Sequence, residues 1–245
     1  MYKRQLPGLA QESGNLSTSL RVYDEAGHLL AQQDGGFLPQ TGQWIAGSRQ
    51  TQTLSLPLPV ALAPGDYTIN LLVYLQTDGQ PLTFTFDQKT SAEFPLGTIS
   101  VQSPTRPVDP STALARFDYI DLVSAEVARA EQAAAEGLDV RLVWQPRARD
   151  YRDTYAVTLE LVDEAGTVAA QWTDALGGWA YPSGMWPASV PVLDWKHFMP
   201  DPRPAPGLYT LTLSVSRAAD GQPIPARTGI WPRGDTLELG SIRLR

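Results

Sequence analysis

The chain has 245 residues, of which 42% are hydrophobic and 18% are charged, which is enough apolar material for the core of one large domain or two ordinary ones. A formal net charge of −7 repels phosphate backbones and excludes a nucleic-acid partner, while the absence of cysteine excludes disulfides, thiolate nucleophiles and cysteine-ligated metals. The 20 glycines and 21 prolines are typical of short strands joined by tight turns.

The first residues carry a basic pair, Lys3 and Arg4, but no apolar stretch follows it, so this segment does not resemble a signal peptide. No apolar run anywhere in the chain approaches the roughly 20 residues that a membrane-spanning helix needs. We therefore expect any export signal or membrane anchor to lie outside this chain.

The first half of the chain is predicted to consist of strands joined by turns. Asp24–Gly27 separates a strand ending at Tyr23 from one starting near Leu29, and its glycine supplies the positive φ of a tight hairpin. A Pro-Gly turn then leads into a long strand whose apolar residues alternate with its other residues. These apolar residues are Tyr67, Ile69, Leu71, Val73 and Leu75. Such alternation indicates an antiparallel sheet that packs on one side.

Five motifs of the first half return in the same order in the second half. The pairs are Asp24–Gly27 with Asp163–Gly166, Gly42–Trp44 with Gly184–Trp186, Pro64–Thr68 with Pro206–Thr210, Asp78–Pro81 with Asp220–Pro223, and Leu96–Ile99 with Leu239–Ile242. The offset grows from 139 to 142 and then to 143 residues, which places a short insertion near Trp172–Gly177. This order predicts two copies of one module in tandem.

The second copy contains two further strand-like stretches, Phe117–Val123 and Leu138–Trp144, whose first-copy equivalents would mostly fall before residue 1. The predicted fold is therefore all-β, with two tandem immunoglobulin-like antiparallel β-sandwiches, the first of which lacks its opening strands. The predicted boundaries are residues 1–102 for the first sandwich, 103–115 for a Pro-rich linker and 116–245 for the second sandwich.

An incomplete sandwich exposes unpaired strand edges and an apolar face, so we expect the first module to form a weak homodimer or to be completed by another segment. The Ala-rich stretch 126–136 has a helical composition, but both of its flanks are strand-like. A hairpin connection is the preferred interpretation of this stretch, and a short helix is the alternative.

The order of motifs resembles a bacterial sandwich module. The residues that carry the resemblance are Asp121-Leu122, Trp144, Asp163–Gly166, Gly184–Trp186, Pro206–Tyr209, Asp220-Gly221 and Leu239-Gly240. In the family that it resembles, this module forms the C-terminal extracytoplasmic part of membrane glycosyltransferases of the dolichyl-phosphate-mannose type and of related surface proteins. The resemblance implies an extracytoplasmic location, with membrane attachment and glycosyl transfer belonging to segments absent from this chain.

No catalytic residues, metal ligands or cofactor are predicted. The chain has only two histidines, His28 and His197, and it contains neither a Gly-x-Ser-x-Gly nucleophile motif nor a phosphate-binding glycine loop. The adjacent carboxylates Asp163 and Glu164 recur with the hairpin glycine, so turn formation explains them better than catalysis does. A hydrolase that uses an unrecognised carboxylate pair about 5–10 Å apart is kept as an alternative.

Six of the seven tryptophans lie in the second copy, and several of these have no counterpart in the first. Aromatic side chains on a loop can stack on sugar rings, and nearby Asp174, Asp194 and His197 could bond sugar hydroxyls. The candidate ligand-binding residues are Trp172, Trp179, Tyr181, Asp194 and Trp195, with Trp231 as a further unmatched ring. This hypothesis requires Trp179 and Tyr181 to be exposed and coplanar, whereas the competing interpretation is that the rings cover the core.

The leading prediction is therefore a non-enzymatic, extracytoplasmic structural or interaction module that belongs to a larger membrane or surface protein. Its partner is a protein or a glycan. A carbohydrate-binding module that uses the loop aromatics of the second domain is the alternative.

Overall fold

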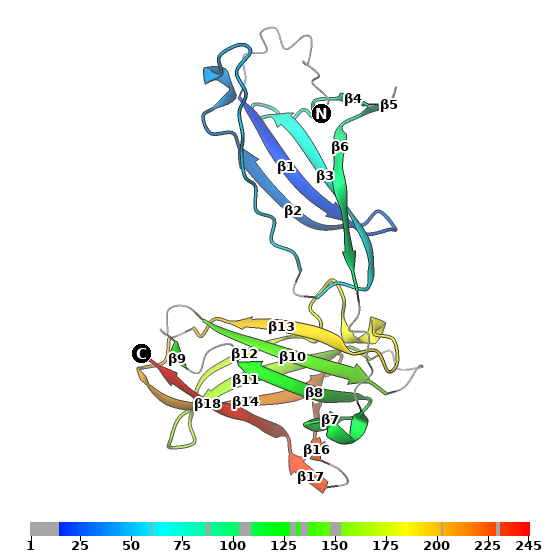
Figure 1. Cartoon of the computed structure of the whole chain (residues 1–245). Helices are drawn as coiled ribbons and strands as arrows, with labels where there is room; N and C mark the ends of the chain where they lie inside the picture. Colours follow the sequence, from blue (N-terminus) through cyan, green and yellow to red (C-terminus); the bar gives the residue numbers. More distant parts are fainter. Residues whose placement is uncertain are drawn as a thin grey trace. The chain divides into compact units, whose positions relative to one another are not determined.

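The computed structural model describes residues 15–59, 61–86, 89–102, 109–127, 131–132, 137–147, 153–201, 203–228 and 231–245 (Figure 1). In these ranges the chain is built almost wholly of strands, which confirms the all-β prediction, and its only helical elements are three short 3-10 turns. No helix in these ranges is long and apolar enough to cross a membrane. Residues 103–108 of the predicted linker lie outside the description.

The chain forms two compact units. The first unit comprises Met1–Leu58 and Gly65–Ser100, and the second comprises Pro59–Pro64 and Val101–Arg245. The short segment Pro59–Pro64 therefore belongs to the second unit, although in the sequence it lies between two parts of the first unit and directly precedes β3. Ala61 is 6% exposed and is part of the second unit's apolar core.

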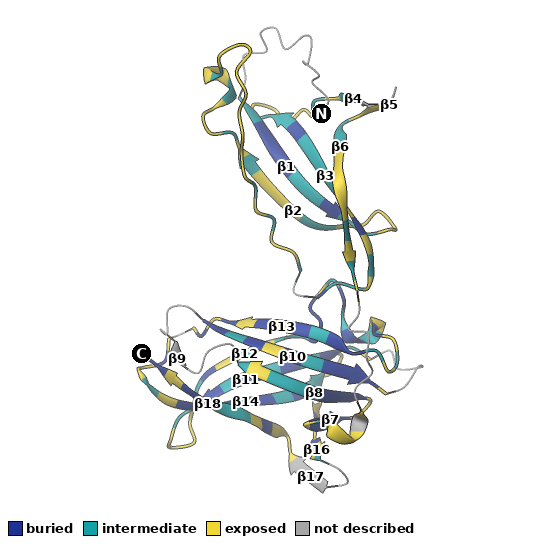
Figure 2. Ribbon diagram, in the orientation of Figure 1, coloured by how far each residue is buried: buried dark blue, intermediate teal, exposed yellow. Residues whose placement is uncertain are grey.

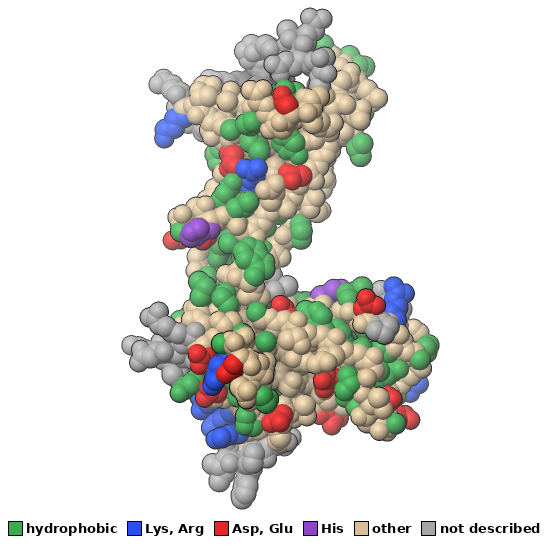
Figure 3. Space-filling view, turned by 180° about the vertical axis from the view of Figure 1, so that it is seen from behind, with side chains coloured by type: hydrophobic (Ala, Val, Ile, Leu, Met, Phe, Trp, Pro, Cys, Tyr) green, Lys and Arg blue, Asp and Glu red, His purple; other side chains and the backbone are tan. Residues whose placement is uncertain are grey.

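The first unit contains one four-stranded sheet and one small hairpin. The sheet has the order β2 (Leu29–Gly36), β1 (Leu16–Tyr23), β3 (Gly65–Leu75) and β6 (Glu93–Val101), and the hairpin pairs β4 (Phe84–Phe86) with β5 (Lys89–Ser91). Strand β1 pairs antiparallel with both of its neighbours, β2 and β3. From behind, hydrophobic side chains of this unit reach the surface among backbone atoms and side chains of other types (Figure 3).

The second unit is a sandwich of two sheets. The β10 sheet has the order β13 (Val192–Phe198), β10 (Leu138–Pro146), β8 (Ile120–Val127), β7 (Ala115–Phe117), β16 (Ala226–Thr228) and β17 (Trp231–Gly234). The β14 sheet has the order β12 (Val168–Ala175), β11 (Tyr155–Val162), β14 (Gly207–Arg217), β18 (Thr236–Leu244) and β9 (Glu131–Gln132), with β15 (Pro223–Ile224) beside β14. Alternate residues of both sheets are buried in a common core, as alternating strands require.

Two sequence predictions about the second unit need comment. The predicted single strand Phe117–Val123 is wrong, because a turn divides it into β7 and β8, and Asp118 in that turn has a φ of 45°. In the Ala-rich stretch 126–136, residues 126–127 end β8 and β9 pairs parallel with β18. Residues 128–130 and 133–136 of that stretch lie outside the description.

The sheet of the first unit and the β14 sheet agree in strand order and in register. Leu20 of β1 lies opposite Gln33 and Leu71, and Leu159 of β11, which is 139 residues later, lies opposite Trp172 and Leu213. Each pair of strands has a register shift at the same place, after Val22 in the first unit and after Leu161 in the second.

Turns at matching positions also have the same geometry. Gly27 and Gly166 have φ values of 83° and 81°, and Gly79 and Gly221 have values of 73° and 70°. Only glycine adopts such values without strain, which accounts for its recurrence in both hairpins. The insertion in the second half falls in the turn that follows Ala175, because β12 keeps the offset of 139 to its end.

Some of the matching residues differ in burial, whereas others, such as Tyr67 and Tyr209, are buried in both units. Leu159, Leu211 and Leu213 are fully buried beneath the β10 sheet. Their counterparts Leu20, Ile69 and Leu71 are only half-buried. Figure 2 shows the same contrast, with dark blue concentrated in β10, β11 and β14 and teal prevailing along β3. Residues 48–59, which include the counterpart of β13, form no strand in the first unit.

Candidate functional site

The predicted pair of exposed rings does not form. Trp179 is 68% exposed in the turn after β12, but Tyr181 is only 3% exposed. The Tyr181 ring lies 6.4 Å from that of Trp186, and the Trp186 indole donates a 2.8 Å hydrogen bond to the carbonyl of Tyr181. The expectation that Trp179 and Tyr181 are both exposed and coplanar is therefore wrong, because Trp186 holds Tyr181 against the core.

Trp172 also belongs to the edge of the core. Its ring stacks on that of Phe198, with centroids 6.3 Å apart and an interplanar angle of 28°. It is half-buried and packs against the apolar cluster between the sheets. Trp231 begins β17, and its side chain lies outside the described part of the chain.

The alternation of β13 separates two of the predicted ligand residues. Val192, Asp194, Lys196 and Phe198 point into the sandwich and are buried. Trp195 points outward and is 42% exposed. Asp194 and Trp195 therefore cannot contact the same ligand, because successive residues of a strand face opposite sides of its sheet.

Asp194 takes part instead in a buried charge cluster between β12 and β13. The Lys196 ammonium lies 3.0 Å from Asp194 Oδ1, 2.9 Å from Asp174 Oδ2 and 2.6 Å from the carbonyl oxygen of Ala175. The side chains of Lys196 and Asp194 are fully buried, whereas that of Asp174 is 36% exposed. Burial raises the pKa of the Asp194 carboxyl, and the charge of Lys196 opposes that rise.

This cluster is suited to a structural role. A fully buried ammonium cannot contact a dissolved substrate, and its three oxygen partners satisfy it inside the protein. In the first unit the counterparts of Lys196 and Asp174 are Leu54 and Gly35, and a Cβ placed on Gly35 would lie 3.8 Å from Leu54 Cδ2. At this place in the fold, the first unit therefore has the apolar side chain of Leu54 beside Gly35, whereas the second unit has the ion pair of Lys196 and Asp174.

The outer face of the β10 sheet carries an exposed row of polar and aromatic residues. Arg141 lies opposite Trp195 on one side and opposite Glu126 on the other, with its guanidinium 3.7 Å from the Glu126 carboxylate. In the next row His197 Nδ1 lies 2.7 Å from Asp139 Oδ1, and both side chains are partly exposed. This face offers a ring for stacking and several groups for hydrogen bonding.

A shallow pocket of about 420 Å³ borders the hairpin turn at Asp163–Ala165. The Asp163 carboxylate accepts hydrogen bonds of 2.9 Å and 2.8 Å from the amides of Ala165 and Thr167, so it serves the turn. Within the described ranges no group of three or more His, Asp or Glu residues is placed to hold a metal ion.

Comparisons with known proteins add little to this geometry. No family model matches the chain, and no curated protein matches it. Among solved structures, the crystal structure of the Bacteroides uniformis β-glucuronidase matches with a TM-score of 0.32 and 11% identity, over 87% of this chain and 23% of that chain. The chain thus spans less than a quarter of that enzyme's length, and so low a similarity carries no functional argument.

Sequence reasoning missed Lys196 and Arg141. Both could have been found by extending the alternation of β10 and β13, which places Lys196 on the inward face with Asp194, and Arg141 on the outward face with Trp195.

We predict that Lys196→Met lowers the free energy of unfolding of the second unit by about 3–5 kcal/mol at neutral pH, because it leaves the Asp194 carboxylate buried without its cation. The double variant Lys196→Met/Asp194→Leu should recover most of this loss, as the Leu54 counterpart suggests. Urea unfolding followed by tryptophan fluorescence measures both effects. The loss in the single variant should shrink at acid pH as Asp194 becomes protonated, and a loss below about 1 kcal/mol at neutral pH would contradict the buried pair.

Proposed function

We propose that this chain is a non-enzymatic, extracytoplasmic structural or interaction module that belongs to a larger membrane or surface protein. It contains two copies of one sheet-forming module in tandem. The shared strand order, register shift and turn geometry of the two units support the repeat. The resemblance of the motif order to extracytoplasmic sandwich modules supports the location.

The difference in burial between the two copies carries the proposal. Some residues that are fully buried in the second unit have half-buried counterparts in the first, as Leu213 and Leu71 illustrate. Other first-unit residues, such as Val22 and Tyr67, are already buried, so the exposed part of this face is limited. Burying a Leu or Ile side chain completely contributes about 1.5–3 kcal/mol relative to leaving it in water. Covering Leu20, Ile69 and Leu71 would therefore stabilise the first unit by a few kcal/mol, which is a driving force for association.

The proposed occupant of this face is a second copy of the chain. Two first units related by a twofold axis would bring identical faces together, and the paired sheets would form the two layers that one copy of the second unit already has. The two facing sheets are identical in such a pair, so their strand lengths and their apolar residues match. The extent of the face, about four strands wide, suits a weak dimer better than an obligate one.

We predict that sedimentation velocity of the full chain shows a concentration-dependent dimer, and that Leu71→Glu abolishes it. Thr68→Glu is the matched control, because Thr68 is exposed on the other face of the same strand. Circular dichroism checks that both variants remain folded. A wild-type chain that stays monomeric at millimolar concentration, or a Leu71→Glu variant that still dimerises, would overturn the proposed interface.

Carbohydrate binding is the second candidate function, and one observation favours it. The outer face of the β10 sheet presents Trp195 beside Arg141, with His197 and Asp139 in the next row. A sugar ring can stack on an exposed indole while neighbouring polar groups bond its hydroxyls. Trp179 is more exposed than Trp195, at 68% against 42%, but it lies in the turn after β12 rather than on this face.

If this face binds a glycan, Trp195→Ala should weaken binding by about 30-fold or more, since buried aromatic anchors typically contribute at least 2 kcal/mol. Trp179→Ala should retain affinity. Affinity electrophoresis in gels containing soluble polysaccharides measures both variants against the wild type. Equal retardation of the wild type and Trp195→Ala would eliminate this face as the glycan site.

A further inference from the structure

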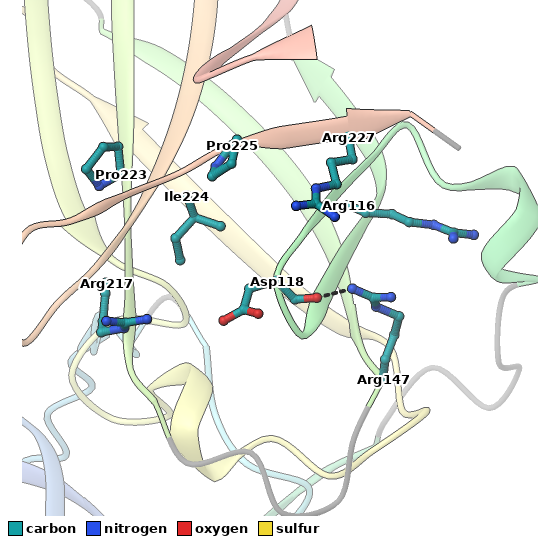
Figure 4. A pocket seen from close by; sticks show the side chains of 8 residues that line it. All are labelled: Arg116, Asp118, Arg147, Arg217, Pro223, Ile224, Pro225 and Arg227. Atoms are coloured by element: carbon teal, nitrogen blue, oxygen red, sulfur yellow. Dashed lines mark hydrogen bonds between the residues drawn. The ribbon is translucent and has the colours of Figure 1, made fainter. Parts of the chain in front are cut away.

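An arginine-rich pocket lies at one end of the second unit's sandwich. None of the ligand-binding residues predicted from the sequence lines it. Its volume is about 510 Å³, within the range typical of small-molecule sites. Both sheets contribute to it. The lining residues are Arg116, Asp118, Arg147, Arg217, Pro223, Ile224, Pro225 and Arg227 (Figure 4).

Four arginines line this pocket although the whole chain carries a net charge of −7. Arg116 and Arg147 share the buried carboxylate of Asp121, at 3.9 Å and 3.2 Å. Arg217 lies 3.3 Å from Asp220 and 4.0 Å from Asp153.

Arg227 differs from the other three arginines. It is exposed on β16, and no carboxylate among the described residues lies within ion-pair distance of it. In the pairing of β16 with β7, Arg227 lies directly opposite Arg116. Like charges directly opposite each other on neighbouring strands destabilise a sheet. A bound anion would relieve this repulsion.

Asp118 gives the pocket a second kind of group. It lies between Arg217 and the other three arginines in Figure 4. The Tyr155 hydroxyl donates a 2.9 Å hydrogen bond to Asp118 Oδ2, and Arg147 donates one to the Asp118 carbonyl oxygen. The left-handed backbone at Asp118, with a φ of 45°, places this carboxylate at the tip of the β7–β8 turn.

We infer that this pocket binds a small oxyanion that also carries a hydroxyl group. Guanidinium groups bind phosphate and carboxylate oxygens through paired, charge-assisted hydrogen bonds. Arg227 and Arg116 donate hydrogen bonds to the anionic oxygens, and the Asp118 carboxylate accepts a hydrogen bond from the hydroxyl group of the same ligand. This site is independent of the sheet face assigned to association, so either assignment can fail without the other.

Inorganic phosphate and sulfate are the two probes, because hydrogen phosphate carries an O–H near neutral pH whereas sulfate does not. Titration calorimetry of the full chain at low ionic strength should give a tighter dissociation constant for phosphate than for sulfate. Arg227→Gln should weaken phosphate binding about tenfold or more, and Arg49→Gln, which removes another exposed charge, in the first unit, should leave it unchanged.

Asp118→Asn tests the role assigned to the carboxylate, and asparagine tolerates the left-handed backbone at this position. This variant should lose the preference for phosphate over sulfate. The inference is overturned if wild-type chain binds neither anion at millimolar concentration, or if Arg227→Gln binds phosphate as tightly as the wild type does. Equal wild-type affinities for phosphate and sulfate would refute the role of Asp118.

Discussion

A β-sheet with one apolar face needs a second layer over that face, and this requirement governs both halves of the chain. In the second unit the β10 sheet supplies the layer, and the inward leucines of β11 and β14 are completely buried. In the first unit a sheet of the same order and register is accompanied, among the described residues, by no sheet larger than the two-stranded β4–β5 hairpin. The segment that corresponds to β13 forms no strand there, because a strand needs a neighbouring strand to bond.

The positions that match between the two units and those that differ have different physical roles. Matching positions hold turn glycines, apolar residues of the inward faces and the indoles of Trp44 and Trp186, which donate to the carbonyls of Pro39 and Tyr181 at 2.9 Å and 2.8 Å. Positions that differ hold the charge cluster at Lys196, the exposed row at Trp195 and the arginine pocket. Interactions specific to the second unit are therefore concentrated outside the shared framework.

The sequence was sufficient for the strand class and for the turns, because alternation and glycine positions are local signals, as at Gly27 and Gly166. It was insufficient for the candidate site. The burial of Tyr181 involves packing against Trp186, whose indole donates a hydrogen bond to the Tyr181 carbonyl, and the arginine pocket joins strands that are distant in the chain. Such long-range packing leaves no local pattern, although the alternation of β13 could have separated Asp194 from Trp195.

Hydrogen exchange of the backbone amides tests most directly whether the first-unit sheet and the β14 sheet are copies of one sheet, of which only the β14 sheet is fully covered by a second sheet. The amides of β14 should exchange only through complete unfolding of the second unit, whereas those of β3 should exchange faster through opening of the uncovered sheet. Exchange in β3 should also slow as the protein concentration rises. Equal protection of β3 and β14 at every concentration would contradict this account.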